Sequence, residues 1–150
     1  MRERAVSIQH HYEPANDIPP VVYVVDDDPV IRRALEFLLT AVGYRVVLCA
    51  DGHEFLDRFV PGLPGCLVLD VRMPGMSGLE LQTLLQRRAV QLPTIMISGN
   101  VGTSHGEDAV SAGAVAMIAK PFDNHVLLEH VHAAIAGQQG AVPTSEDNEG

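Results

Sequence analysis

Short apolar runs alternate with helix-like patterns through most of the chain. Each run has four or five residues, is rich in Val, Ile and Leu, and is bounded by polar residues or turn formers. Such continuous runs are typical of strands buried on both faces, as in a parallel sheet. The pattern predicts five strands, at residues 21–25, 45–49, 66–69, 94–97 and 115–119.

Helical spacing of apolar residues follows each predicted strand. The first helix is expected to begin at Asp28 and Pro29, a capping carboxylate followed by a proline in the first turn, and to end at Gly43. Further helices are expected over 51–59, 77–88, 104–112 and 123–136. The fourth of these is the weakest, because Gly102 and Gly106 loosen its start.

Five strands alternating with five helices, joined by short links, predict an α/β fold with a doubly wound parallel sheet. The segments outside this alternation have different compositions. Residues 1–19 carry no hydrophobic period and are interrupted by prolines, so we expect a flexible leader. Residues 137–150 have the composition of a tail or the start of a linker. One domain over 20–136 remains.

Composition narrows the class of function. The chain has 150 residues, 47% of them hydrophobic and 19% charged, as in a globular domain. Nineteen acidic residues against ten Lys and Arg give a net charge of −9, which disfavours direct nucleic-acid binding. No apolar run is long enough to span a membrane. Cys49 and Cys66 lie in apolar runs, and we expect both to be reduced in a cytoplasmic protein.

Polar side chains follow four of the five predicted strands. Asp26, Asp27 and Asp28 follow the first, and Asp70, Ser98 and the only lysine, Lys120, follow the third, fourth and fifth. Ligands of such sheets bind at the carboxyl ends of the strands. Clustered carboxylates repel one another unless a cation lies among them, and oxygen ligands suit Mg²⁺, with Mn²⁺ as the alternative.

An aspartate in such a cluster can also act as a nucleophile towards phosphorus, with a metal and a lysine neutralising the phosphoryl oxygens. The residues alone leave open which aspartate attacks. Asp70 is favoured because it follows the predicted central strand, which leaves Asp26 and Asp27 as metal ligands.

Three segments, at 24–29, 67–78 and 120–122, together resemble the receiver domain of bacterial two-component response regulators. They read Val-Val-Asp-Asp-Asp-Pro, Leu-Val-Leu-Asp-Val-Arg-Met-Pro-Gly-Met-Ser-Gly and Lys-Pro-Phe. The likeness covers residues 20–136 and is greatest to the subgroup that heads helix-turn-helix transcription factors. It implies a flavodoxin-like five-stranded parallel sheet of order 2-1-3-4-5 with five helices.

The resemblance also implies roles for individual residues. Asp70 would accept a phosphoryl group from a sensor histidine kinase or a phosphotransfer protein. Asp26, Asp27, Asp70 and the backbone carbonyl of Arg72 would hold Mg²⁺. The chain would then be a switch rather than an enzyme, with only self-phosphorylation and autodephosphorylation expected.

On the same basis, Lys120 would bind the phosphoryl oxygens and Ser98 would hydrogen-bond one of them. The Lys120–Pro121 bond would be cis. One position departs from the family pattern, because Met117 stands where a switch Tyr or Phe is usual. A Met has no ring whose rotamer could report the state of Ser98, so we expect a different coupling between the site and the far face.

Two other functions share part of this residue pattern. A phosphatase of the haloacid-dehalogenase kind needs a second Asp two residues after the nucleophile, where this chain has Arg72. A degenerate receiver that serves only as a protein-interaction module is the alternative that stays open. The resemblance also implies a phosphorylation-dependent homodimer through the fourth and fifth helices and the fifth strand. The kinase, the signal and any DNA-binding domain beyond residue 150 are not specified by these residues.

Overall fold

The computed structural model describes residues 18–99 and 113–147, which form five strands and four helices. The elements are β1 (Val21–Val25), α1 (Pro29–Ala41), β2 (Arg45–Cys49), α2 (Gly52–Arg58), β3 (Gly65–Asp70), α3 (Gly78–Arg87), β4 (Thr94–Ser98), β5 (Ala116–Ala119) and α5 (Asn124–Asp147). The helix predicted over 104–112 lies outside the described residues.

The five strands form one parallel sheet in the order β2-β1-β3-β4-β5, as predicted. β1 therefore lies inside the sheet, β2 forms one edge, and β3, β4 and β5 follow in order to the other edge. β3 is the central strand, and all six of its residues are buried. The carboxyl ends of all five strands meet at one edge of the sheet.

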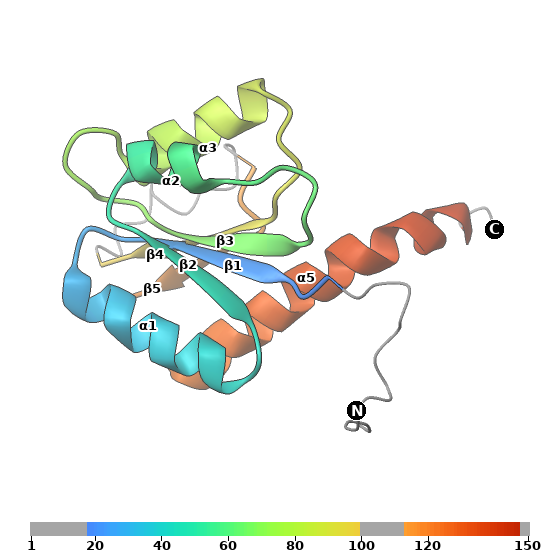
Figure 1. Ribbon diagram of the computed structural model, residues 1–150, viewed down its shortest axis with the longest axis horizontal. Helices are drawn as coiled ribbons and strands as arrows, with labels where there is room; N and C mark the ends of the chain where they lie inside the picture. Colours follow the sequence, from blue (N-terminus) through green and yellow to red (C-terminus); the bar gives the residue numbers. More distant parts are fainter. Residues whose placement is uncertain (1–17, 100–112, 148–150) are drawn as a thin grey trace, which may run out of the picture.

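Helices cover both faces of the sheet (Figure 1). Side chains of a strand alternate between its two faces, and β1 divides accordingly. Val21, Tyr23 and Val25 pack in one core with α2 and α3, whereas Val22 and Val24 pack in the other with α1 and α5. This two-sided burial explains why the strands read as continuous apolar runs.

Two helices start at caps that the sequence marks. The Asp28 carboxylate accepts a hydrogen bond from the Val30 backbone N–H at 2.9 Å and caps α1. Ser77 and Glu80 form a reciprocal capping box at the start of α3. These caps set where the chain leaves β1 and β3, and so where the residues after those strands lie.

The last helix is longer than predicted. The expected end at residue 136 is wrong, because α5 continues to Asp147 and projects past the sheet (Figure 1). The Gln138 side chain connects the first turn of this extension to the domain. Its Oε1 accepts from the Gly65 N–H at 2.9 Å, and its Nε2 donates to the Gln91 carbonyl at 3.5 Å. This tertiary contact outweighs the poor helix propensity of Gly137.

Smaller differences concern strand ends and cysteines. Val115, predicted as strand, precedes β5 and is 58% exposed. Cys49 and Cys66 are buried and free, as expected, and burial raises the pKa of each thiol to about 12. Among the described helices, none combines the length and apolar character that a membrane crossing requires.

Candidate functional site

A hollow of about 660 Å³ opens at the carboxyl ends of the strands. It is lined by residues at or just after the ends of β1, β3, β4 and β5, namely Asp26, Asp27, Asp28, Pro29, Asp70, Arg72, Gly99 and Lys120. The predicted strand-end residues therefore meet in one place, apart from Ser98. Ser98 is buried at the end of β4, where its carbonyl accepts from the Lys120 N–H at 2.8 Å, and Gly99 lines the hollow instead.

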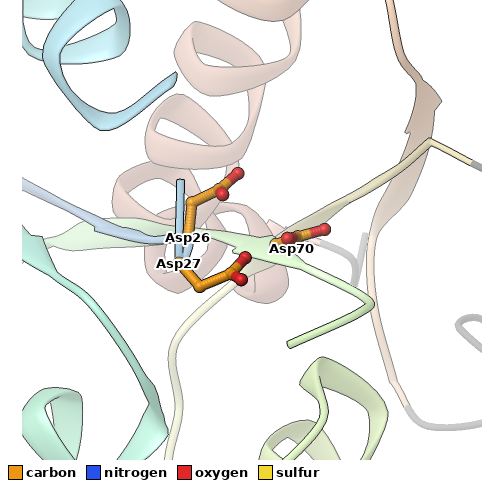
Figure 2. Close-up of side chains that lie close together, drawn as sticks. All are labelled: Asp26, Asp27 and Asp70. Carbon is orange, nitrogen blue, oxygen red and sulfur yellow. The ribbon is translucent and has the colours of Figure 1, made fainter. Parts of the chain in front are cut away.

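Three carboxylates gather in this hollow (Figure 2). Asp26 and Asp27 directly follow β1, and Asp70 is the last residue of the neighbouring β3. One oxygen from each lies within 4.8 Å of the others. Asp26 and Asp70 are buried, at 2% and 5% exposure, while Asp27 is exposed. The site thus has two sheltered carboxylates and one that faces solvent.

Asp26 is held by main-chain contacts on both sides. Its N–H donates to the Cys49 carbonyl at 3.2 Å, which continues the β1–β2 pairing past the strand. Its Oδ1 accepts from the Asp28 N–H at 2.9 Å. The first bond fixes the Asp26 main chain, and the second satisfies one oxygen of a carboxylate that is otherwise removed from water.

Lys120 reaches both buried carboxylates. Its Nζ lies 3.4 Å from Asp26 Oδ2 and 3.6 Å from Asp70 Oδ1. The residue follows β5, and the Lys120–Pro121 peptide bond is cis, as the resemblance implied. One ammonium therefore pairs with the two buried carboxylates. The described lining of the hollow has four acidic and two basic residues, so its formal charge stays negative unless a further cation enters.

Burial of Asp70, together with the charges around it, shifts the pKa of its carboxyl. The pKa of the Asp70 carboxyl is raised to about 6. Burial is the largest cause, and the negative charge of Asp26 is the second. Lys120 and a hydrogen bond from the Arg72 N–H, at 3.3 Å, act in the opposite direction but do not cancel this rise. The ionised form of Asp70 is thus less favourable in the protein alone than in water and would be stabilised by added positive charge.

The donor set fits a divalent cation with hard oxygen ligands. Three carboxylates within reach of one point, open to solvent on the Asp27 side, leave room for waters and a phosphate, which is the coordination that Mg²⁺ prefers. Arg72 lines the hollow, and its residue is exposed. The proposed role of its backbone carbonyl as a further ligand remains a prediction.

The segment after Asp70 approaches the strand closely. The Gly78 N–H donates to the Val71 carbonyl at 2.9 Å, and a Cβ on Gly78 would lie 2.1 Å from the Asp70 carbonyl oxygen. Only a glycine fits there. Together with the Ser77 cap, this explains why the Met-Pro-Gly-Met-Ser-Gly motif ends as it does: it returns the chain into α3 directly beside the acidic hollow.

Sequence reasoning missed one contact at the site. The Arg32 guanidinium, on α1, donates from Nη1 to the Asp26 backbone carbonyl at 2.7 Å. A side chain that binds a main-chain oxygen leaves no periodic signal in the sequence. The nearest hint is its place one helical turn after the Asp28 cap.

Met117 lies on β5, half-buried, and packs against the core beneath α2 and α3. It pairs in register with Met96 of β4. The position predicted for the switch aromatic is therefore filled by an apolar side chain that packs against the core.

Residues 22–132 match the family described as response regulator receiver domain. Among curated proteins, nodulation protein W of Bradyrhizobium diazoefficiens is 42% identical over 114 residues, which cover 76% of this chain and 50% of that protein. The transcriptional regulatory protein FixJ of Azorhizobium caulinodans is 38% identical over 121 residues, which cover 79% of this chain and 57% of that protein. The chain thus spans about half the length of the curated relatives it matches.

Solved structures agree. The response regulator StyR superposes with a TM-score of 0.76 at 36% identity, over 87% of this chain and 68% of that one. A structure titled FixJ-N superposes with a TM-score of 0.71 at 38% identity, over 77% of this chain and 92% of that one. These relatives are response regulators, and one of them is named a transcriptional regulatory protein. The family is the one that the sequence motifs resemble.

Proposed function

The chain belongs to the response regulator receiver domain family, and we propose on that basis that it is a phosphoacceptor switch of a two-component system. Asp70 takes the phosphoryl group, and Asp26, Asp27, Asp70 and the Arg72 carbonyl hold Mg²⁺. The observation that carries this proposal is the convergence of three carboxylates and one ammonium in a single hollow at the end of the central strand.

The proposed transfer is a direct displacement at phosphorus. An ionised Asp70 oxygen attacks phosphorus and forms the new O–P bond. The P–N bond of a phosphohistidine on the donor breaks, its electron pair stays on the imidazole nitrogen, and that nitrogen takes up a proton from solvent. The bound cation would neutralise charge on the carboxylates and the phosphoryl oxygens. Lys120, whose Nζ lies 3.6 Å from Asp70 Oδ1, is positioned to donate to a phosphoryl oxygen.

The switch follows from the charge change. A phosphoryl group on Asp70 adds negative charge and new acceptor oxygens to the hollow. Ser98 would turn its hydroxyl to one of these oxygens, and Lys120 would hold another, which biases the loops after β4 and β5. We propose that this bias changes partner binding or homodimerisation through the fourth and fifth helices and β5.

Partners and boundaries are part of the proposal. The phosphoryl donor is a sensor histidine kinase or a phosphotransfer protein. The proposed location of the protein is the cytoplasm, where the free thiols of Cys49 and Cys66 would stay reduced. We propose that residues 20–136 form the receiver domain and 1–19 a leader. Residues 137–150, where α5 continues and Gln138 contacts the domain, are proposed as a tail or the start of a linker. This chain itself does not bind nucleic acid, because its net charge is −9.

Intact mass spectrometry after incubation with acetyl phosphate tests the chemistry. We expect wild type to gain the mass of one phosphoryl group with Mg²⁺ and none with EDTA. Asp70→Asn should gain nothing, whereas Asp51→Asn, which removes the same charge from the cap of α2, should react as wild type does. If wild type gains nothing even from a phosphorylated kinase, the proposal is wrong and the interaction module is the better account.

A further inference from the structure

Arg32 of α1 donates to the backbone carbonyl of Asp26, at 2.7 Å, on the first residue after β1. We propose that Arg32 is a positioning residue of the metal site: by holding this carbonyl it orients the peptide from which the Asp27 carboxylate projects. The inference rests on the metal-binding part of the proposed function. It assigns Arg32 no contact with the ion or the phosphoryl group.

The covalent geometry supplies the first step. The Asp26 carbonyl and the Asp27 N–H belong to one planar peptide group. Fixing the carbonyl oxygen therefore restricts rotation of the whole plane, and with it the direction in which the Asp27 side chain leaves the backbone. A charge-assisted hydrogen bond from a guanidinium is a strong way to do this.

The need for such support differs between the two aspartates. The Asp26 carboxylate has its own anchors, the Asp28 N–H and Lys120 Nζ. Within the described residues, the Asp27 carboxylate has no hydrogen-bond or ion-pair partner, and the residue is exposed. Its direction thus depends on the main chain, which is what Arg32 holds.

Electrostatics alone would give the opposite effect, which makes the inference testable. Arg32 places a positive charge behind an acidic hollow that should attract Mg²⁺. If charge were all that mattered, removing Arg32 would strengthen Mg²⁺ binding. If Arg32 orients the ligands, removing it should weaken binding, because residues that orient metal ligands typically contribute about 10–100-fold in affinity.

The chain offers a matched control one residue away. Arg33 is on the same helix and carries the same charge, but its residue is exposed and lies on the outer face of α1. Arg33→Ala therefore changes net charge and helix composition as Arg32→Ala does, without removing the bond to Asp26.

Calorimetric titration with Mg²⁺, with no phosphoryl donor present, measures the effect. We expect Arg32→Ala to raise the Mg²⁺ Kd about tenfold, Arg33→Ala to leave it near the wild-type value, and Arg32→Lys to fall between, because an ammonium can still donate to the carbonyl. A Kd in Arg32→Ala that equals or is below the wild-type value would overturn the inference. If Arg32→Ala does not fold, Arg32→Lys is compared with Arg33→Lys, and equal affinities would overturn it.

Kinetics separate positioning from general stabilisation. With acetyl phosphate, Arg32→Ala should need more Mg²⁺ for half the maximal rate and recover the wild-type rate when Mg²⁺ is saturating. A lowered unfolding midpoint with an unchanged Mg²⁺ requirement would show a merely structural role. Wild type that fails to bind Mg²⁺ would refute the proposed function itself, whereas wild type and Arg32→Ala that bind equally would refute only the role of Arg32.

Discussion

Strand β3 begins at Gly65 and ends at Asp70, and its two ends lie in very different surroundings. At the start, Gly65 packs against the Val21 backbone, and its N–H donates a hydrogen bond to the Gln138 side chain. Both of these contacts are with uncharged groups. At the other end, Asp70 faces two further carboxylates and one ammonium, and its pKa is raised to about 6.

The two ends of β3 contribute differently to stability and to function. The start has its polar groups paired and its space filled, so changes there should lower stability. The end holds carboxylates that repel one another in the protein alone, an arrangement that disfavours folding and that a bound cation would relieve. Such locally unfavourable sites are typical of functional centres.

The largest effect is expected from Gly65→Ala. A Cβ there would lie 1.9 Å from the Val21 carbonyl oxygen, so the β1–β3 pairing must shift, at a cost of about 3 kcal/mol or more. Urea unfolding should show this loss. The control is Gly137→Ala in α5, where a Cβ meets nothing within 4 Å and stability should rise by roughly 0.5–1 kcal/mol. Equal midpoints for the two variants would contradict the close packing at Gly65.

At the other end, Asp70→Asn should stabilise the metal-free protein. Because folding raises the Asp70 pKa from 3.8 to about 6, wild type loses stability as pH rises through that window and keeps the full penalty above it. The rise is about two pKa units, and one unit is about 1.4 kcal/mol, so the variant should gain on the order of 3 kcal/mol at pH 8 and much less near pH 4.

Thermal melts in EDTA at both pH values measure this gain. Excess Mg²⁺ should raise the melting temperature of wild type more than that of Asp70→Asn, since binding stabilises the folded state. A variant less stable than wild type in EDTA at pH 8 would show that Asp70 carries no unfavourable charge in the fold.

A smaller loss is expected from Gln138→Ala, about 1 kcal/mol for two hydrogen bonds at the edge of the domain. Amide exchange followed by NMR should also show faster exchange at Gly65. Gln91→Ala is the matched control, because Gln138 binds only the main-chain oxygen of Gln91, which alanine retains. Equal stability and equal Gly65 exchange rates in the two variants would show that the Gln138 side chain does not make these hydrogen bonds in solution.

The sequence predicted most of the fold because strands buried on both faces read as unbroken apolar runs. It also placed Asp26, Asp70 and Lys120 together, since carboxyl ends of parallel strands share one edge. The end of α5 was missed because Gly137 and the glycine and proline beyond it are poor helix formers, while the stabilising Gln138 contact joins residues far apart in sequence. The Arg32 contact was missed for a similar reason, because it ends on a main-chain atom.

The most direct test locates the phosphoryl group within the chain. Borohydride reduces an aspartyl phosphate to the alcohol, which marks the acceptor, and trypsin should then release residues 59–72 after Arg58 as one peptide. Asp70 is the only carboxylate of that peptide, whereas Asp26 and Asp27 fall in the peptide that ends at Arg32. We predict that the reduced residue lies in 59–72 after reaction with acetyl phosphate and Mg²⁺, and that it is absent with EDTA. A reduced residue in the peptide that holds Asp26 and Asp27 would contradict the assignment of Asp70 as the acceptor.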